Sequence, residues 1–256
     1  MCDLLVASFS SEYTAPKTLH EFMIRCVRRG DLDGWGVGFF LKNREGVIVK
    51  NTDFVFRENT IITAFDLVAR CIESEIILAH FRLASRKELY GEKYAHPFKA
   101  KFLGAEWIFA HNGYSESILE YRTSNRIIHK DRTFDSPRIF EFIRDKMIEY
   151  LHGGPLRSLF YAVKNAIKEL YHSYDGTYNF ILANSNVVFI NLDGQHPHNN
   201  RMYMIVRRKT GYDRAIIVTT VPNLTNEEWI TVRPRRNHRG KLLMISEGEL
   251  LYNADV

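Results

Sequence analysis

Strand-like and helix-like segments follow one another along this chain in an order that restricts its fold. Apolar runs typical of strands come first, helical patterns occupy the middle, and from residue 177 onward the pattern is again that of strands. This order predicts a layered protein whose sheets are mostly antiparallel. The expected strands are 2–9, 33–40, 75–81, 106–110, 178–183, 187–191, 202–207, 215–219 and 242–245, and the expected helices are 17–29, 60–73, 115–121, 136–151 and 156–171.

Length and composition predict an ordinary globular protein. At 256 residues the chain can bury a large core, and we expect a single domain, 1–256. Hydrophobic residues make up 45% of it, without an apolar run of membrane-spanning length or a signal-peptide pattern, so we expect a cytoplasmic protein that binds no membrane. Cys2, Cys26 and Cys71 are too widely spaced for structural zinc and form no disulfide framework; we expect Cys26 and Cys71 in helix cores.

Glycine recurs at every second position of segment 33–40, as Gly34, Gly36 and Gly38. Alternate residues of a strand point to the same face, so one face of this strand lacks side chains and another backbone or a ligand can approach it closely. The segment does not match the dinucleotide-binding pattern G-x-G-x-x-G, because its third glycine stands one position too early and no helix follows.

The net charge of +5, from 35 basic and 30 acidic residues, is too small to require a polyanionic partner. A run of basic side chains near the C-terminus could contact RNA or an acidic partner. No aromatic stacking residues accompany the run, so we interpret it as a solvated loop and expect no nucleic-acid binding. The run consists of Arg233, Arg235, Arg236, His238, Arg239 and Lys241.

Cys2 follows the initiator methionine and heads an apolar strand. Removal of Met1 would make it the first residue, and its own α-amino group, with a pKa of about 7.7 to 8.0, could accept the thiol proton. Such a cysteine can attack an amide without help from another side chain or a metal. Alternatively, Cys2 is only a small apolar residue in a strand, which is common for a free cysteine.

Three polar positions lie where expected elements end or begin. Arg82 follows strand 75–81, Asn112 and Gly113 occupy a turn after strand 106–110, and Asp135 stands at the start of a helix capped by Ser136. Taken singly, Arg82 could form a salt bridge, Asn112-Gly113 is a common turn dipeptide, and Asp135 could interact with the helix dipole. Together with a leading cysteine they supply a nucleophile, an oxyanion site, a cation and an anion, which are the groups that hydrolysis of a glutamine amide requires.

These motifs, taken in order, resemble those of the class II glutamine amidotransferases of the N-terminal nucleophile hydrolase superfamily. The matching positions span most of the chain. They are Met1-Cys2 with the strand that follows, Asp33-Gly34-Trp35-Gly36-Val37-Gly38, Ala79-His80-Phe81-Arg82-Leu83-Ala84-Ser85 with His96-Pro97-Phe98, Phe109-Ala110-His111-Asn112-Gly113, and Thr133-Phe134-Asp135-Ser136.

The resemblance implies an α+β fold, a four-layer αββα sandwich of two mostly antiparallel sheets. It implies that L-glutamine is hydrolysed to glutamate and ammonia through a thioester on Cys2, without cofactor or metal. The resemblance implies that Asn112 and Gly113 form the oxyanion hole. It also implies that Arg82 binds the α-carboxylate of glutamine and that Asp135 binds its α-amine. The remaining residues implied in substrate binding are Leu83, Ser85 and His96.

The chain departs from the family pattern at positions around the substrate rather than at the nucleophile. Ser85 stands where a threonine is usual, and Tyr94 where an asparagine often precedes His-Pro. Pro137 replaces a frequent acid, and Thr219-Thr220-Val221-Pro222 stands where a Ser-Glu-Pro-like stretch is typical.

Two other functions compete with glutamine hydrolysis. A metal site could use His80, His96 and His111, or the pair His196 and His198, but neither set has recognised ligand spacing, and we expect His80 and His111 to be structural polar residues near the site. A non-catalytic binding subunit could retain the fold with its cysteine blocked by Met1.

The matching motifs leave little sequence for an acceptor domain, so we expect a stand-alone module. It would be either a glutaminase subunit that delivers ammonia to a separate synthase or a free-standing hydrolase of glutamine, γ-glutamyl amides or peptides. Residues 83–98 form a long polar segment that we interpret as a lid over the site.

Overall fold

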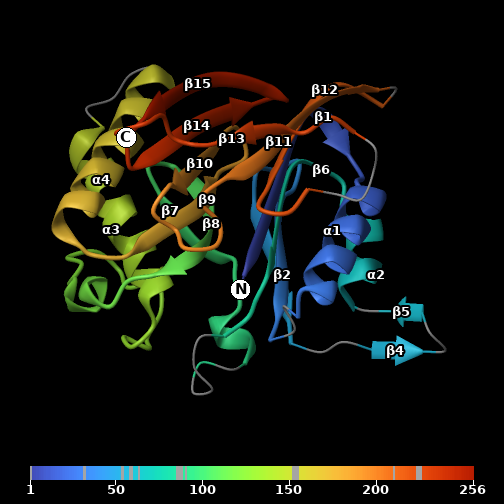
Figure 1. The fold of residues 1–256 in the computed structure, drawn as a ribbon, viewed down its shortest axis with the longest axis horizontal. Coiled ribbons are helices and arrows are strands. Elements are labelled where there is room, and N and C mark those ends of the chain that lie inside the picture. The colour runs from blue at the N-terminus through green and yellow to red at the C-terminus, as the bar shows by residue number, and fades with distance from the viewer. Residues whose placement is uncertain are drawn as a thin grey trace.

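The computed structural model describes residues 2–30, 33–52, 55–57, 60–62, 64–84, 89, 91–151, 156–209, 211–222 and 227–256. Two sheets face each other in the middle, with one pair of helices outside each sheet (Figure 1). All strand pairings among these residues are antiparallel. The fold is therefore the four-layer αββα sandwich that the sequence motifs implied.

The first sheet has seven strands, and its outer face packs against α1 (Pro16–Arg28) and α2 (Ala64–Cys71). These helices lie at the right of Figure 1. In spatial order the strands are β13 (Ile230–Val232), β11 (Met202–Lys209), β12 (Tyr212–Thr219), β1 (Asp3–Tyr13), β6 (Ser74–Phe81), β2 (Trp35–Phe40) and β3 (Gly46–Asn51).

The second sheet has six strands and packs against α3 (Asp135–Tyr150) and α4 (Leu156–Ser173), at the left of Figure 1. Two 3-10 turns, Glu92–Tyr94 and Ser117–Glu120, and a ribbon of β4 (Val55–Arg57) and β5 (Thr60–Ile62) complete the described elements. The strands are, in order, β15 (Glu249–Asp255), β14 (Gly240–Ser246), β10 (Val188–Asp193), β9 (Thr177–Ala183), β8 (Ala105–Tyr114) and β7 (Phe98–Phe102).

β1 is buried on both faces because its two sets of alternating side chains enter different cores. Leu5, Ala7 and Phe9 belong to the cluster under α1 and α2, whereas Leu4 and Val6 belong to the cluster between the sheets. β12 and β6 flank the strand on its two edges. The residue in front of β1 is thereby fixed from several sides at the end of the sandwich.

The glycine-lined face of β2 lies against the second sheet, as the glycine spacing indicated. A Cβ atom on Gly36 would stand 2.0 Å from the carbonyl oxygen of His96, and one on Gly38 would stand 2.7 Å from the side chain of Ile108. Trp35 and Val37, on the other face, are buried under the helices. The missing side chains thus allow the segment around His96 to lie directly on β2.

Several local predictions were wrong. Residues 60–62 form β5 instead of starting a helix, since they pair with β4, and α2 covers only Ala64–Cys71, which leaves Cys71 exposed near its end. β7, β13 and β15 were not expected. Part of the expected lid, 85–88 and 90, lies outside the described residues. Within the described part of the chain, no helix combines the length and apolar character needed to cross a membrane.

Candidate active site

Cys2 lies directly in front of β1, and its thiol contacts the backbone that follows β6. Its Sγ is 3.3 Å from the carbonyl oxygen of Leu83 and 3.4 Å from the amide nitrogen of the same residue. The register Asp3 with Phe81 brings these two segments together. Figure 1 shows this end of the chain between the two sheets. Cys2 is half-buried, whereas Cys26 is buried in the core.

The carbonyl oxygen of Cys2 accepts hydrogen bonds from two side-chain amides. Nδ2 of Asn112, on β8, lies 2.6 Å away, and Nδ2 of Asn199 lies 3.2 Å away. A primary amide carries two N–H groups, so the bond to Cys2 uses one of the two on Asn112. These contacts join the first residue of the described chain to the second sheet.

Asn112 and Gly113 lie within β8, not in the turn expected from their sequence. They pair with Asn179 and Tyr178 of β9. A Cβ atom on Gly113 would stand 1.9 Å from the carbonyl oxygen of Thr177 and 2.6 Å from Nε2 of His111, so only glycine allows β8 and β9 to approach this closely. Strand pairing has overridden the turn preference of the Asn-Gly dipeptide.

Asp135 is buried in the first turn of α3. The N-cap is Phe134, so the helix begins one residue before the predicted cap at Ser136. The backbone N–H of Ser115 donates to Oδ2 of Asp135 at 2.9 Å, and the hydroxyl of Ser136 lies 3.4 Å from Oδ1. The carboxylate is therefore held beside the end of β8.

His111 connects Ser136, the residue after Asp135, to the backbone of β9. Its Nε2 is 3.1 Å from the carbonyl oxygen of Thr177, which can only accept, so the proton lies on Nε2 and Nδ1 accepts from the hydroxyl of Ser136 at 3.0 Å. Burial lowers the pKa of His111, against the opposing charge of Asp135. The ring is thus held by hydrogen bonds on both of its nitrogens.

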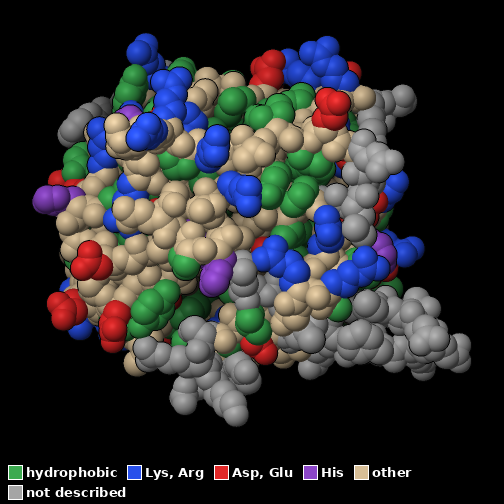
Figure 2. Space-filling view, viewed as in Figure 1, with side chains coloured by type: hydrophobic (Ala, Val, Ile, Leu, Met, Phe, Trp, Pro, Cys, Tyr) green, Lys and Arg blue, Asp and Glu red, His purple; other side chains and the backbone are tan. Residues whose placement is uncertain are grey.

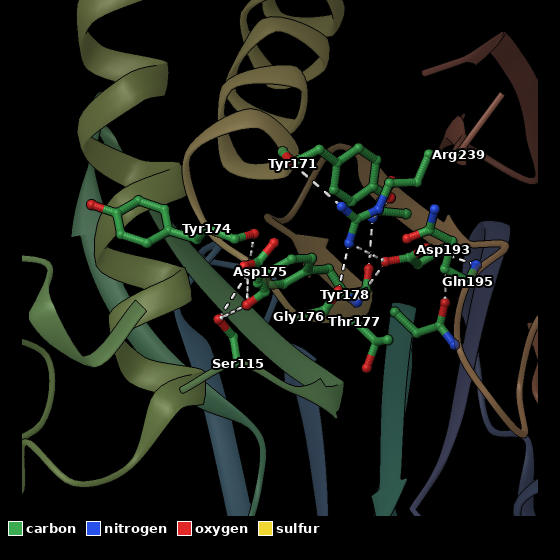
Figure 3. A network of polar contacts seen from close by, with 12 residues as sticks. Ser115, Tyr171, Tyr174, Asp175, Gly176, Thr177, Tyr178, Asp193, Gln195 and Arg239 are labelled. Atoms are coloured by element: carbon green, nitrogen blue, oxygen red, sulfur yellow. Dashed lines mark hydrogen bonds and ion pairs between the residues drawn. The ribbon is translucent and has the colours of Figure 1, made fainter. Parts of the chain in front are cut away.

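Ser115, which holds Asp135, belongs to a hydrogen-bond network that Figure 3 shows. Its hydroxyl donates to the carbonyl oxygen of Asp175 at 2.6 Å, and the hydroxyl of Tyr178 donates to Ser115 at 2.8 Å. Burial raises the pKa of Tyr178 to about 12, which keeps its proton available for this bond. The network fixes the segment between β8 and the 3-10 turn at Ser117–Glu120.

Arg82 is buried, and its guanidinium group lies over the ring of Phe134, with Cζ 5.9 Å from the ring centroid. Nη1 donates to the carbonyl oxygen of Leu89 at 2.7 Å. The backbone around Arg82 is held by the glycine-rich segment, because its N–H donates to the carbonyl oxygen of Gly34 at 2.8 Å and its carbonyl accepts from Asp33 at 2.9 Å.

Contacts and sequence adjacency link several of the expected site residues. Cys2 contacts Asn112 and Leu83, Leu83 is adjacent to Arg82, Arg82 lies over Phe134, and Phe134 is adjacent to Asp135. Ser115 closes the series through Asp135 and the end of β8. Leu83 is exposed, and Ser85 lies outside the described residues.

His96 is buried behind this series and contacts Phe134 and His80. Its ring centroid lies 5.9 Å from that of Phe134 and 4.4 Å from that of His80. Neither ring nitrogen of His96 has a hydrogen-bond partner among the described residues. Burial lowers the pKa of both rings well below the ordinary value, and the charge of Arg82 acts in the same direction, so both are neutral. The described residues contain no group of three or more His, Cys, Asp or Glu side chains arranged to hold a metal ion.

Sequence reasoning missed the residues that hold Cys2 in place through its neighbours. Asp3 is fully buried; its Oδ1 accepts from the hydroxyl of Thr220 at 2.8 Å, and its Oδ2 lies 3.4 Å from Nε of Arg29. Thr220 lies in the stretch that departs from the family pattern. The acid directly after Cys2 was the available signal, since a buried carboxylate requires partners. Asn199 gave no sequence signal.

Comparisons with known proteins identify the family of this chain. The profile described as "Glutamine amidotransferases class-II" matches residues 1–210. A Haemophilus influenzae protein named "Putative glutamine amidotransferase" is 26% identical over 222 residues, which are 77% of this chain and 69% of that protein.

Two solved structures are similar in fold. A predicted glutamine amidotransferase from Pseudomonas aeruginosa has a TM-score of 0.67 and 19% identity, and the match covers 98% of this chain and 100% of that one. Glutamine phosphoribosylpyrophosphate amidotransferase from B. subtilis has a TM-score of 0.62 and 14% identity, over 99% of this chain and 49% of that one. With the family profile covering most of its residues, the chain belongs to the class II glutamine amidotransferases.

Proposed function

We propose that this protein hydrolyses the side-chain amide of L-glutamine, with Cys2 as the nucleophile. One observation carries the proposal: the side-chain amide of Asn112 donates to the carbonyl oxygen of Cys2, and the thiol of Cys2 contacts the backbone of Leu83. A candidate nucleophile and a candidate oxyanion donor are thus held at one point. Family membership supports glutamine as the substrate class.

In this mechanism, removal of Met1 frees the α-amine of Cys2, which accepts the thiol proton. The sulfur attacks the amide carbon, and the second N–H of Asn112 together with the backbone N–H of Gly113 stabilises the oxyanion, a contribution of about 3 to 4 kcal/mol per donor in comparable sites. The ammonium group of Cys2 returns the proton to the leaving nitrogen, and ammonia departs. Water then cleaves the thioester to give glutamate.

Specificity in this proposal comes from the two charged ends of glutamine. Arg82 binds the α-carboxylate, and Asp135 binds the α-amine through the oxygen that Ser115 does not occupy. Both side chains are buried, so each interaction forms in a partly desolvated setting where leaving one charge unpaired is costly. Leu83, Ser85 and His96 complete the proposed substrate site, His96 from behind Phe134.

The nucleophile is tested with Cys2→Ala, and Cys71→Ala is the matched control because it removes an exposed thiol. We expect Cys2→Ala to abolish glutamate release at an unchanged melting temperature and the control to retain activity. A diazoketone analogue of glutamine should add its mass to the peptide that contains Cys2 and to no other. Full activity of Cys2→Ala, or of protein that retains Met1 by intact mass, would falsify the mechanism.

We also propose that the ammonia acceptor is a separate synthase. The purified chain should then hydrolyse glutamine slowly, and addition of its partner should accelerate it. Fast turnover by the purified chain, with no protein retained on the Cys2→Ala variant, would instead indicate a free-standing hydrolase of glutamine or γ-glutamyl amides.

A further inference from the structure

The basic run near the C-terminus borders a groove of about 1170 Å³. Five arginines and one histidine line it, and the described lining residues include no lysine, acidic residue, phenylalanine, tyrosine or tryptophan. In Figure 2, Lys and Arg side chains gather on the face over β10 and β14, and acidic side chains lie toward its margins. The charged lining residues are Arg201, Arg233, Arg235, Arg236, His238 and Arg239.

Arg239 is the fixed cation of this groove. Its guanidinium group lies over the ring of Tyr171, with Cζ 4.2 Å from the centroid, and Nη2 is 3.1 Å from Oδ2 of Asp193 (Figure 3). The carbonyl of Gly176 accepts from the same nitrogen. The backbone N–H of Gly194 donates to the carbonyl oxygen of Arg239 at 2.8 Å, which joins the two loops that form the walls.

Three other arginines carry charge that no described acid neutralises. Arg201, Arg233 and Arg236 are exposed, and no acidic side chain of the described residues lies within ion-pair distance of them. Arg235, by contrast, lies 3.5 Å from Asp255. Like charges brought together without counter-charges repel each other. An anion that enters the groove reduces this repulsion, so its binding is favourable.

The composition of the groove selects among anionic ligands. Guanidinium forks match the oxygen geometry of phosphate groups, and every permanently charged side chain here is arginine. Sequence-tolerant RNA binding uses aromatic stacking, and protein interfaces centre on apolar anchors; the lining offers only Pro234 as an apolar side chain. We propose that this groove binds a small molecule bearing more than one phosphate group.

The groove lies beside the proposed glutamine site. The segment between β10 and β11 lines the groove with Gly194, Gln195, Asn200 and Arg201, while the Asn199 amide on the same segment binds the carbonyl oxygen of Cys2. A bound anion would therefore lie next to Asn200, the residue that follows Asn199 in the sequence. Such a molecule is placed to be a co-substrate or effector of the thiol site.

Binding is tested by titration calorimetry with inorganic pyrophosphate at pH 7.5, using full-length Cys2→Ala protein at low and at physiological salt. We expect saturable one-to-one binding. The double variant Arg233→Gln, Arg236→Gln should weaken it about ten-fold or more, which corresponds to about 1.4 kcal/mol or more, because two charge-assisted contacts to the anion are removed. The matched control is Arg28→Gln, Arg208→Gln, which removes two exposed arginines outside the groove lining and should bind as before.

Three outcomes would overturn the proposal: no saturable pyrophosphate binding, an equal loss in the control, or tight binding of single-stranded RNA without binding of pyrophosphate. Circular dichroism of each variant verifies folding. Because Cys2→Ala is used throughout, the result does not depend on glutamine turnover, and failure of this proposal leaves the proposed hydrolysis untouched.

Discussion

The side-chain nitrogen of Asn112 lies 2.6 Å from the carbonyl oxygen of Cys2, so a strand of the second sheet holds the residue that precedes the central strand of the first. Asn199 reaches the same oxygen at 3.2 Å from a loop. The two amides share one acceptor, but only Asn112 is adjacent to Gly113. In the proposed mechanism, Asn199 would therefore only position Cys2, whereas Asn112 would also stabilise the oxyanion.

Asn112→Ala should lower kcat for glutamine about 10²- to 10³-fold, the usual cost of losing one oxyanion donor. Asn199→Ala removes a bond to the same carbonyl and should have a much smaller effect on kcat. Steady-state kinetics of both variants, with melting temperatures as a check of folding, test this. Equal losses of kcat would mean that Asn112 acts only by positioning Cys2.

Asp135→Asn should raise KM for glutamine, because the amide cannot neutralise the α-ammonium group while its oxygen can still accept from Ser115. We expect kcat/KM to fall about 30-fold or more, which corresponds to about 2 kcal/mol. Glutaric acid monoamide, which lacks the α-amine, serves as the control substrate and should not discriminate between the two proteins. If the unmutated enzyme hydrolyses it as well as glutamine, Asp135 does not bind the amine.

Gly113→Ala should push β8 away from β9, since its Cβ would stand 1.9 Å from the carbonyl oxygen of Thr177. Gly104→Ala is the control, because its Cβ would meet nothing within 4 Å although its φ is +74°. We expect Gly113→Ala to lower the free energy of unfolding by about 1 to 3 kcal/mol more than the control. Urea denaturation measures both, and equal losses would show that the strands separate easily here.

The buried histidines should make the protein sensitive to acid. Burial lowers the pKa of His80 and His96 well below the ordinary value and that of His196 to about 4. Below about pH 6.5 the unfolded chain binds more protons than the folded protein, so stability is complete above that pH and falls as pH decreases, by up to about 1.4 kcal/mol per pH unit for each histidine.

Urea denaturation at pH 7.5, 6.5 and 5.5 measures this slope. Replacement of His96 by Gln should reduce the slope, because it removes one buried ring whose pKa is lowered. A slope that does not respond to His96→Gln would mean that the ring is protonated in the folded protein.

The layered fold could be predicted from sequence because it depends on local periodicity. β1 shows this well, since its apolar run is long enough to be buried on both faces. The alternating glycines of β2 predicted a close backbone approach, and the carbonyl of His96 fills that space. β13 was missed because it has only three residues, and β15 because Leu250 and Leu251 are neighbours, so its apolar residues do not alternate with polar ones as in a typical strand.

The contacts around the candidate site were less predictable because they join distant segments. Asn112-Gly113 has the composition of a turn, and only pairing with β9 keeps it extended. Asn199 is 197 positions from Cys2, and Thr220 is 217 from Asp3, so no local pattern connects them. The order of the motifs indicated which residues to consider, but their hydrogen-bond partners depend on tertiary packing.

The backbone of Cys2 connects the two sheets, because Asp3 pairs with β6 in the first and the Cys2 carbonyl is bound by β8 in the second. The apolar cluster between the sheets sets their separation, with Leu4, Ile108 and Ile181 among its members. A substitution there that changes side-chain volume would alter the sheet spacing and therefore the distance from Cys2 to Asn112. Under the proposed mechanism, the packing between the two sheets would therefore set the distance between the candidate nucleophile and its candidate oxyanion donor.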